Sequence, residues 1–187
     1  MRKVVLFMHT TVDGFAAGRN GEMDWIHVDE EIFDYAGNET DKADAALYGR
    51  VTYQMMDGYW PTAGDEPNAS KHDIQHSKWY NSVRKIVLSK TMKVDKHKNT
   101  IVISDNIGRE INTLKQQPGK NILIFGSATA VQSLLEENLV DEFWLFVNPV
   151  VLGKGLSFFS GVKNILSLKL LSSKAFTSGV VCLHYEK

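Results

Sequence analysis

The sequence predicts an α/β fold, a three-layer α/β/α arrangement around a mainly parallel mixed sheet with an antiparallel C-terminal edge. Short apolar runs rich in β-branched residues alternate with longer amphipathic segments over the first three quarters of the chain, which is typical of a parallel sheet covered on both faces. The last two apolar runs flank Thr177-Ser178-Gly179, a hairpin-type turn. With 187 residues and no linker or internal repeat, the range 1–187 is expected to be one domain.

Eight strands are expected, because eight short apolar runs are bounded by turn residues. The first run starts after two basic residues and is too short for a secretory signal, so it is interpreted as a core strand. The expected strands are 3–10, 44–48, 84–88, 100–103, 121–125, 141–148, 165–173 and 179–186.

Helices are expected between the strands. The segment 30–37 places Ile32 and Phe33 on one side, and Gly37 suits a C-cap. The segment 51–56 follows Gly49, and the segment 70–82 carries Ile74 and two aromatic residues. The stretch 60–68 is rich in helix breakers and is expected to be a loop, long enough for a lid or pocket rim.

Two more helices are predicted in the second half of the chain. The segment 107–117 ends at Pro118-Gly119, a clear stop signal. The segment 127–137 has Ser127 as its expected N-cap, with Val131, Leu134 and Leu135 facing the core.

Composition excludes several classes of protein. The 21 basic and 22 acidic residues nearly cancel, so no overall field attracts nucleic acid or an anionic membrane. No apolar run has the length of a membrane span. The single cysteine, Cys182, cannot form an intrachain disulfide, and a cytoplasmic protein is expected.

Two turns of the sequence are suited to binding phosphate. The strand 44–48 breaks at Gly49 into a helix that opens with Arg50, Val51 and Thr52, so free N–H groups, a helix dipole and a guanidinium meet at one point. The bland alternative, a tight turn with a surface ion pair at Arg50, stays open. The strand 121–125 ends in a second small-residue turn, made of Phe125, Gly126, Ser127, Ala128 and Thr129. Two such turns indicate a ligand with more than one phosphate, as in a dinucleotide.

A third strand delivers Leu88, Ser89 and Lys90 at its carboxyl end, the edge where open α/β sheets bind ligands. Ser89, Lys90 and Arg50 together could hold the 2′-phosphate that distinguishes NADPH from NADH, although Lys90 could equally be an ordinary solvated lysine. Neither a P-loop nor a G-x-G-x-x-G fingerprint occurs, which excludes the standard forms of both nucleotide-binding sites.

These elements, in this order, resemble the dihydrofolate reductase-like superfamily, and in particular the branch with the reductase domain of the bifunctional riboflavin-biosynthesis deaminase-reductase. The resemblance covers nearly the whole chain. The matching segments are Thr11-Val-Asp-Gly-Phe-Ala-Ala17, Ala43-Asp-Ala-Ala-Leu-Tyr-Gly-Arg-Val-Thr-Tyr53 with Gly58-Tyr-Trp-Pro61, Ile124-Phe-Gly-Ser-Ala128, and the stretch from Leu139 to Gly153. Many relatives have two glycines where this chain has Gly126-Ser127.

The resemblance implies an NADPH-dependent reductase that transfers hydride to a C=N or C=O bond of a small heterocycle or sugar-derived molecule. Pterin or folate-like compounds and a 5-amino-6-(5-phosphoribosylamino)uracil-like riboflavin intermediate are the expected substrate classes. The family's ribose-phosphate pocket uses basic residues, of which only Arg50 can be placed here. The zinc deaminase half needs a P-C-x-x-C segment, which one cysteine cannot supply.

The resemblance also implies site residues. Asp13, Gly14 and Phe15 match the first-strand exit, where the nicotinamide lies, although Asp13 could serve only to hold the turn. An acidic residue soon after Trp25 would bind the substrate and support its protonation, and Asp29 and Glu30 are the candidates. Their alternative role is to cap a helix and complement its dipole.

Aromatic residues could wall a planar substrate. Trp25, Tyr53 and Trp60 are the candidates, with Trp25 and Trp60 expected in loops. His72 and His76 form an i, i+4 pair, but their polar surroundings indicate a solvent-exposed helix face, and no metal site is expected.

Two further hypotheses stay open. The chain could be a non-catalytic nucleotide-binding regulatory protein that retains the fold; carboxylates at 29–31 that all face solvent, with no pocket next to the nicotinamide, would favour it. A homodimer through the apolar strand Phe143-Trp-Leu-Phe-Val147 is expected by analogy with the riboflavin branch, although a buried central strand explains this stretch equally well.

Overall fold

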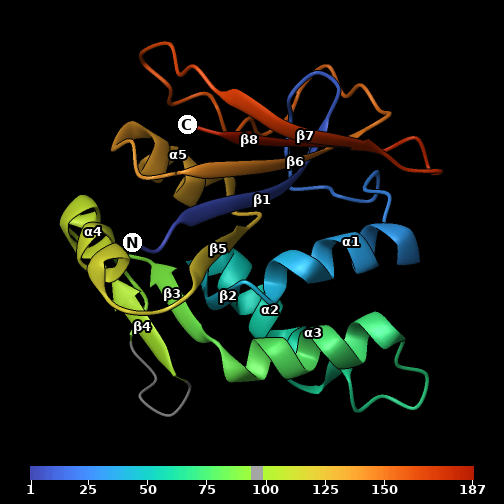
Figure 1. The fold of residues 1–187 in the computed structure, drawn as a ribbon, viewed down its shortest axis with the longest axis horizontal. Coiled ribbons are helices and arrows are strands. Elements are labelled where there is room, and N and C mark those ends of the chain that lie inside the picture. Colours follow the sequence, from blue (N-terminus) through green and yellow to red (C-terminus); the bar gives the residue numbers. More distant parts are fainter. Residues whose placement is uncertain (94–98) are drawn as a thin grey trace.

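The computed structural model describes residues 1–93 and 99–187, which form an eight-stranded sheet with helices on both faces (Figure 1). The strands are β1 (Val4–Thr11), β2 (Ala43–Gly49), β3 (Arg84–Leu88), β4 (Thr100–Ile103), β5 (Asn121–Phe125), β6 (Glu142–Asn148), β7 (Lys169–Ala175) and β8 (Val181–Glu186). The helices are α1 (Glu30–Thr40), α2 (Arg50–Ala63), α3 (Lys71–Ser82), α4 (Ile107–Gln116) and α5 (Ala128–Glu136).

The strand order is β4-β3-β2-β5-β1-β6-β8-β7. The pairs from β4 to β6 are parallel, and the pairs β6–β8 and β7–β8 are antiparallel. The mixed sheet with an antiparallel C-terminal edge is therefore confirmed. Because the first six strands are parallel, their carboxyl ends lie along one edge of the sheet, where a ligand site is expected.

Two apolar layers hold the helices to the sheet. One face carries Ile111 and Leu114 of α4 with Val131 and Leu134 of α5, packed in a single large cluster. The opposite face carries α1, α2 and α3 through two smaller clusters that are rich in aromatic residues. Burial of both faces explains why the central strands are continuous apolar runs without alternation.

Several element boundaries differ from the expectations. Gly37 is not a C-cap, because α1 continues through Thr40 to a cap at Asp41. The helix expected at 51–56 runs to Ala63 with Pro61 inside it, so the loop expected at 60–68 is wrong over its first four residues. Trp60 accordingly lies in a helix and not in a loop. The seventh strand begins at Lys169 instead of 165, because its pairing with β8 starts where Lys169 lies opposite Glu186, the last residue of β8.

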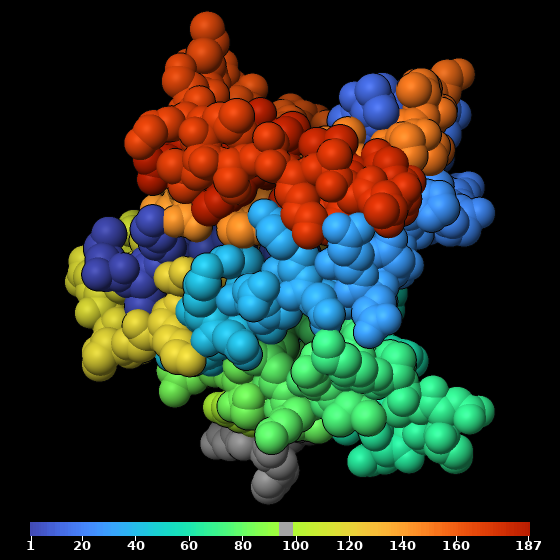
Figure 2. All heavy atoms as spheres, turned by 45° about the vertical axis from the view of Figure 1, so that its right-hand side comes forward, coloured from blue at the N-terminus to red at the C-terminus, as the bar shows by residue number. Residues whose placement is uncertain are grey.

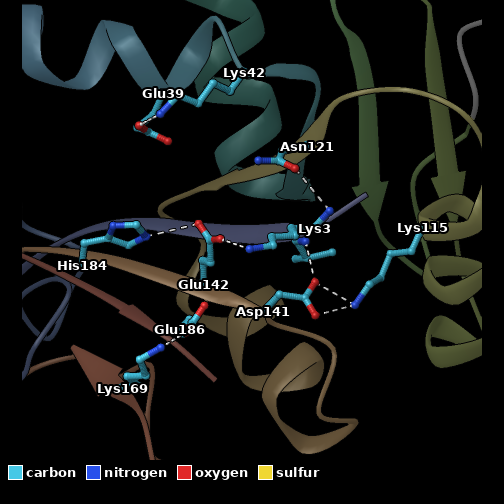
Figure 3. Close-up of polar contacts among 11 residues, drawn as sticks. Lys3, Glu39, Lys42, Lys115, Asn121, Asp141, Glu142, Lys169, His184 and Glu186 are labelled. Carbon is cyan, nitrogen blue, oxygen red and sulfur yellow. Dashed lines mark hydrogen bonds and ion pairs between the residues drawn. The ribbon is translucent and has the colours of Figure 1, made fainter. Parts of the chain in front are cut away.

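The amino edge of the sheet, opposite the carboxyl ends, is held by ion pairs (Figure 3). The Lys115 ammonium is buried and lies 2.7 Å from the Asp141 carboxylate. Asp141 also accepts the backbone N–H of Val4 at 2.7 Å, so this carboxylate links α4 to the first residue of β1. Next to it, Glu142 pairs with Lys3 and with His184.

None of the helices in the described ranges is both long and apolar enough to cross a membrane.

Candidate functional site

A cavity of about 1650 Å³ runs across the carboxyl edge of the sheet. The last residues of the parallel strands line it, among them Phe7 and Met8 of β1, Gly49 of β2, Leu88 of β3 and Phe125 of β5. From this edge it extends to a wall made by α1, α2 and α3. The surface is notched between α1 (blue) and α3 (green) in Figure 2. The volume exceeds the roughly 300–1,000 Å³ of an ordinary small-molecule pocket, so two ligands can fit side by side.

The two predicted phosphate turns touch each other in this cavity. The backbone N–H of Gly49 donates to Ser127 Oγ at 2.7 Å, across 78 residues of sequence. A Cβ at position 49 would lie only 2.6 Å from the same oxygen. Gly49 has an ordinary extended conformation, so the close approach of Ser127, and not the backbone angle, demands glycine there.

The second turn has a left-handed backbone. Gly126 and Ser127 have φ values of 57° and 66°, which turn the chain sharply from β5 into α5. Ser127 occupies the N-cap position, but its hydroxyl makes no capping bond. Its expected role as a side-chain cap is therefore wrong, because the hydroxyl binds Gly49 instead. Ala128 and Thr129 follow in the first turn of α5 and line the cavity, where N–H groups lack intrahelical partners.

Two exposed cations lie at this end of the cavity. Arg50 donates to Gln54 Oε1 at 3.1 Å and has no carboxylate partner among the residues that the structure describes, so the alternative of a surface ion pair finds no support there. Lys90 also lines the cavity. Ser89 lines it too, but its hydroxyl accepts the N–H groups of Thr91 and Met92 at 3.2 and 3.0 Å and so shapes the turn that carries Lys90.

The first-strand exit lies beside the cavity and not in its wall. Asp13 accepts the hydroxyl of Thr11 at 2.6 Å and the N–H of Gly153 at 2.7 Å, and these bonds lower the pKa of its carboxyl, with the Thr11 bond as the largest cause. Gly14, with φ of 84°, and Phe15 complete this turn. The following residues, Ala16 and Ala17, line the cavity, and sequence reasoning missed them.

The structure does not bring the predicted catalytic carboxylates to the cavity. Asp29 caps α1 by accepting the N–H of Ile32 at 2.8 Å. Glu30 is exposed in the first turn of α1. Glu31 accepts Thr177 and pairs with Lys174 at 3.2 Å. The geometry thus agrees with the capping alternative. The large cavity nevertheless lies next to the start of α1, where Val28 and Ile32 line it.

Of the three predicted aromatic walls, only Trp60 lines the cavity. Tyr53 is buried beneath it, with its hydroxyl 3.3 Å from Thr100 Oγ1. Trp25 lies in a turn and donates from Nε1 to the Glu22 carbonyl at 3.2 Å.

His72 and His76 are in the cavity wall, so the prediction of a solvent-exposed face is wrong. The His72 ring stacks on Phe33 of α1 with centroids 3.6 Å apart, and the His76 ring lies 4.1 Å from Trp60. Burial lowers the pKa of His72 and lowers that of His76 to about 3. The spacing of both histidines with Trp79, at i, i+4 and i+7 on one helix, was the available signal.

The comparisons with known proteins agree with this architecture. The sequence model of the RibD C-terminal domain matches residues 2–182. The chain belongs to the RibD C-terminal domain family. It is 36% identical to the Bacillus subtilis (strain 168) protein "Uncharacterized protein YyaP" over 99% of this chain and 95% of that protein.

Two solved structures share the fold of this RibD C-terminal domain. A pyrimidine reductase-like protein from Corynebacterium diphtheriae superposes with a TM-score of 0.67 at 15% identity, covering 99% of this chain and 91% of that one. A diaminohydroxyphosphoribosylaminopyrimidine deaminase/5-amino-6-(5-phosphoribosylamino)uracil reductase from Thermotoga maritima gives 0.68 at 17% identity, covering 99% of this chain and 56% of that one. Both neighbours show that the fold is shared over nearly the whole of this chain.

Proposed function

We propose that this RibD C-terminal domain is an NADPH-dependent reductase that acts on a C=N or C=O bond of a small heterocyclic or sugar-derived molecule. The observation that carries the proposal is the contact between the Gly49 and Ser127 turns, which brings the starts of α2 and α5 together at one end of a large cavity. Two helix N-termini at one point favour a ligand with two linked phosphates.

The residues present fit such a cofactor. Glycine at position 49 lets the two turns approach to hydrogen-bond distance, and the exposed Arg50 and Lys90 are available for the additional phosphate of NADPH. When bound, NADPH would supply a hydride to the carbon of the acceptor bond, and a proton from solvent completes the reduction at nitrogen or oxygen. The protein's part is to orient the acceptor against the cofactor.

Titration with NADPH and NADH, followed by tryptophan quenching and energy transfer to the reduced nicotinamide, tests the cofactor assignment. We expect tight NADPH binding that falls about tenfold in Arg50→Ala and in Lys90→Ala, since a charge-assisted hydrogen bond contributes about 1.5–3 kcal/mol. NADH binding is expected to change much less. Arg109→Ala, an exposed arginine of α4 outside the cavity, is the matched control. Absence of binding by either nucleotide would refute the proposal.

The non-catalytic alternative is tested by the same protein. If NADPH binds but is not oxidised in the presence of any pterin, pyrimidine or sugar-derived acceptor, the regulatory hypothesis becomes the better account. Asp29→Asn and Glu30→Gln are expected to leave NADPH binding unchanged, because neither residue lines the cavity. A large loss of turnover in either variant would instead restore the predicted catalytic role.

We also infer a homodimer, but not through the stretch 143–147. That stretch belongs to β6, which lies between β1 and β8, so it is the buried central strand of the alternative interpretation. Of the two edge strands, β4 and β7, β7 carries Leu170 and Leu171, which are 51% and 42% exposed. An exposed apolar edge strand is a template for pairing with a second copy. Light scattering at micromolar concentration is expected to give a dimer that Leu170→Lys converts to a monomer; a monomeric parent protein would contradict the inference.

A further inference from the structure

The helical wall of the cavity carries a cluster of stacked rings, here called the ring cluster. His76 is at its centre, with ring centroids 4.1 Å from Trp60, 5.2 Å from Trp79 and 5.8 Å from Phe125. The ring centroids of His72 and His76 are 5.3 Å apart, and His72 connects the cluster to α1 by stacking on Phe33. The members all line the cavity: Phe33, Trp60, His72, His76, Trp79 and Phe125. They come from α1, α2, α3 and the end of β5, so the fold assembles this wall from four elements.

The two imidazoles of the ring cluster are built to stay neutral. Burial is the largest cause of the lowered pKa of both groups, and that of His76 falls to about 3. A neutral imidazole offers one N–H donor and one nitrogen acceptor. Within residues 1–93 and 99–187, neither histidine uses a ring nitrogen in a hydrogen bond to the protein. The cluster therefore combines flat apolar faces with free neutral hydrogen-bonding groups.

The charges near the ring cluster do not favour a phosphate. The charged side chains that line the cavity from α1, its C-cap and α3 are Asp34, Asp41 and Lys78, and even with Lys71 beside Asp34 this set has no excess of positive charge. The Lys71 ammonium lies 2.7 Å from the Asp34 carboxylate, so this nearby cation is already paired. Phosphate recognition normally uses clustered arginines or a helix N-terminus. Here those features lie at the Gly49–Ser127 end, which the cofactor would occupy.

We propose that the ring cluster is the acceptor subsite and that it selects an uncharged, planar, conjugated molecule without a phosphate group. The acceptor stacks against Trp60 and forms a hydrogen bond with a ring nitrogen of His76. This inference rests on the proposed reductase function and narrows its substrate class, since it disfavours a phosphoribosylated pyrimidine. Stacking on an aromatic wall and one neutral hydrogen bond are the interactions that a flat heterocycle requires.

A matched series of flavin compounds tests the charge preference directly. Lumichrome, riboflavin and FMN each carry a flat tricyclic ring system, alloxazine in lumichrome and isoalloxazine in the other two, and only FMN carries a phosphate. Isothermal titration of the full-length protein without nucleotide is expected to show binding of lumichrome and riboflavin, with FMN at least about tenfold weaker. Equal or tighter binding of FMN would overturn the proposal. So would the absence of lumichrome and riboflavin binding up to the solubility limit of each compound.

Variants assign the binding to the ring cluster. Trp60→Ala is expected to weaken lumichrome about tenfold through the lost stacking, and His76→Phe, which keeps a ring but removes both nitrogens, about three- to tenfold. His27→Phe changes an exposed histidine outside the cavity and is the matched control. Unchanged lumichrome affinity in both cluster variants refutes the assignment.

The NADPH titration separates this inference from the proposed function. The two cluster variants are expected to bind NADPH as the parent does, which also shows that they are folded. If lumichrome binds and NADPH does not, the subsite stands and the reductase assignment fails. If NADPH binds and the neutral flavins do not, the reductase assignment stands and the acceptor subsite fails.

Discussion

At the scale of single residues, the contact between Gly49 and Ser127 lets us test whether position 49 needs glycine for steric or for conformational reasons. Gly49→Ala is expected to weaken NADPH binding and to lower the free energy of unfolding by about 1–3 kcal/mol, because the new Cβ would lie 2.6 Å from Ser127 Oγ. The double variant Gly49→Ala/Ser127→Ala removes that oxygen and should recover part of both losses. Urea unfolding and NADPH titration of the parent protein and of both variants measure the recovery. No recovery would mean that the turn needs glycine for another reason.

Two partly buried histidines, His9 and His76, predict how stability depends on pH. Burial lowers the pKa of His9 to about 4 and that of His76 to about 3, below the value of about 6.5 in the unfolded chain. The unfolded state therefore binds more protons below pH 6.5, so stability is complete above that pH and is lost as pH falls towards 4. Each histidine contributes a slope of up to about 1.4 kcal/mol per pH unit.

Urea unfolding at pH 7, 6 and 5 checks this pH dependence. His76→Phe is expected to flatten the slope between pH 6 and 5, whereas His27→Phe, an exposed histidine, should leave it unchanged. A parent protein with equal stability at pH 7 and 5 would contradict the burial of these two groups.

Individual residues also show where sequence reasoning stops. Gly49, Arg50, Lys90 and Gly126 were found because turn chemistry is local. The bond from Gly49 to Ser127 spans 78 residues, and no local pattern contains it. The face of α3 was misjudged because apolar Ile74 is 51% exposed while His76 points inward, the reverse of what hydrophobicity predicts.

At the scale of elements, α3 carries both histidines of the ring cluster, so its capping controls the cavity wall. Ser70 accepts the N–H of Asp73 at 3.1 Å, and Asp73 accepts the N–H of Ser70 at 2.9 Å, which together form a capping box. Ser70→Ala is expected to cost about 1 kcal/mol of unfolding free energy. Ser82→Ala, at the last position of the same helix, is the control. Thermal unfolding of both variants measures the difference, and an equal cost at the two ends would contradict the capping role.

Elements were predicted well where hydrophobic period and turn signals agreed, as in the first six strands. α2 was underestimated because Gly58 and Pro61 usually end helices. Pro61 is tolerated in the last turn, where α2 packs against α3 and the Pro61 carbonyl accepts Asn81 Nδ2 at 3.0 Å. Tertiary contacts of this kind override local propensity.

At the scale of the whole molecule, the amino ends of the parallel strands carry ion pairs and their carboxyl ends line the cavity. We therefore expect that stability and NADPH binding can be changed independently. Asp141→Ala at the amino edge removes the partner of buried Lys115 and is expected to cost about 3 kcal/mol. Glu186→Gln breaks the more exposed pair with Lys169 and should cost under about 1 kcal/mol. Urea unfolding measures both losses, and NADPH affinity is expected to be unchanged. Coupled losses of stability and affinity would show that the edges communicate.

The strand order also has a consequence for synthesis on the ribosome. β1 leaves the ribosome before its sheet partners β5 and β6, which lie more than a hundred residues later in the chain. The apolar run Val4–Met8 therefore stays without its strand partners until most of the polypeptide has been made. Contacts between distant parts of a chain slow folding, and exposed apolar strands aggregate. During synthesis this apolar run is therefore without its sheet partners until β5 and β6 have emerged.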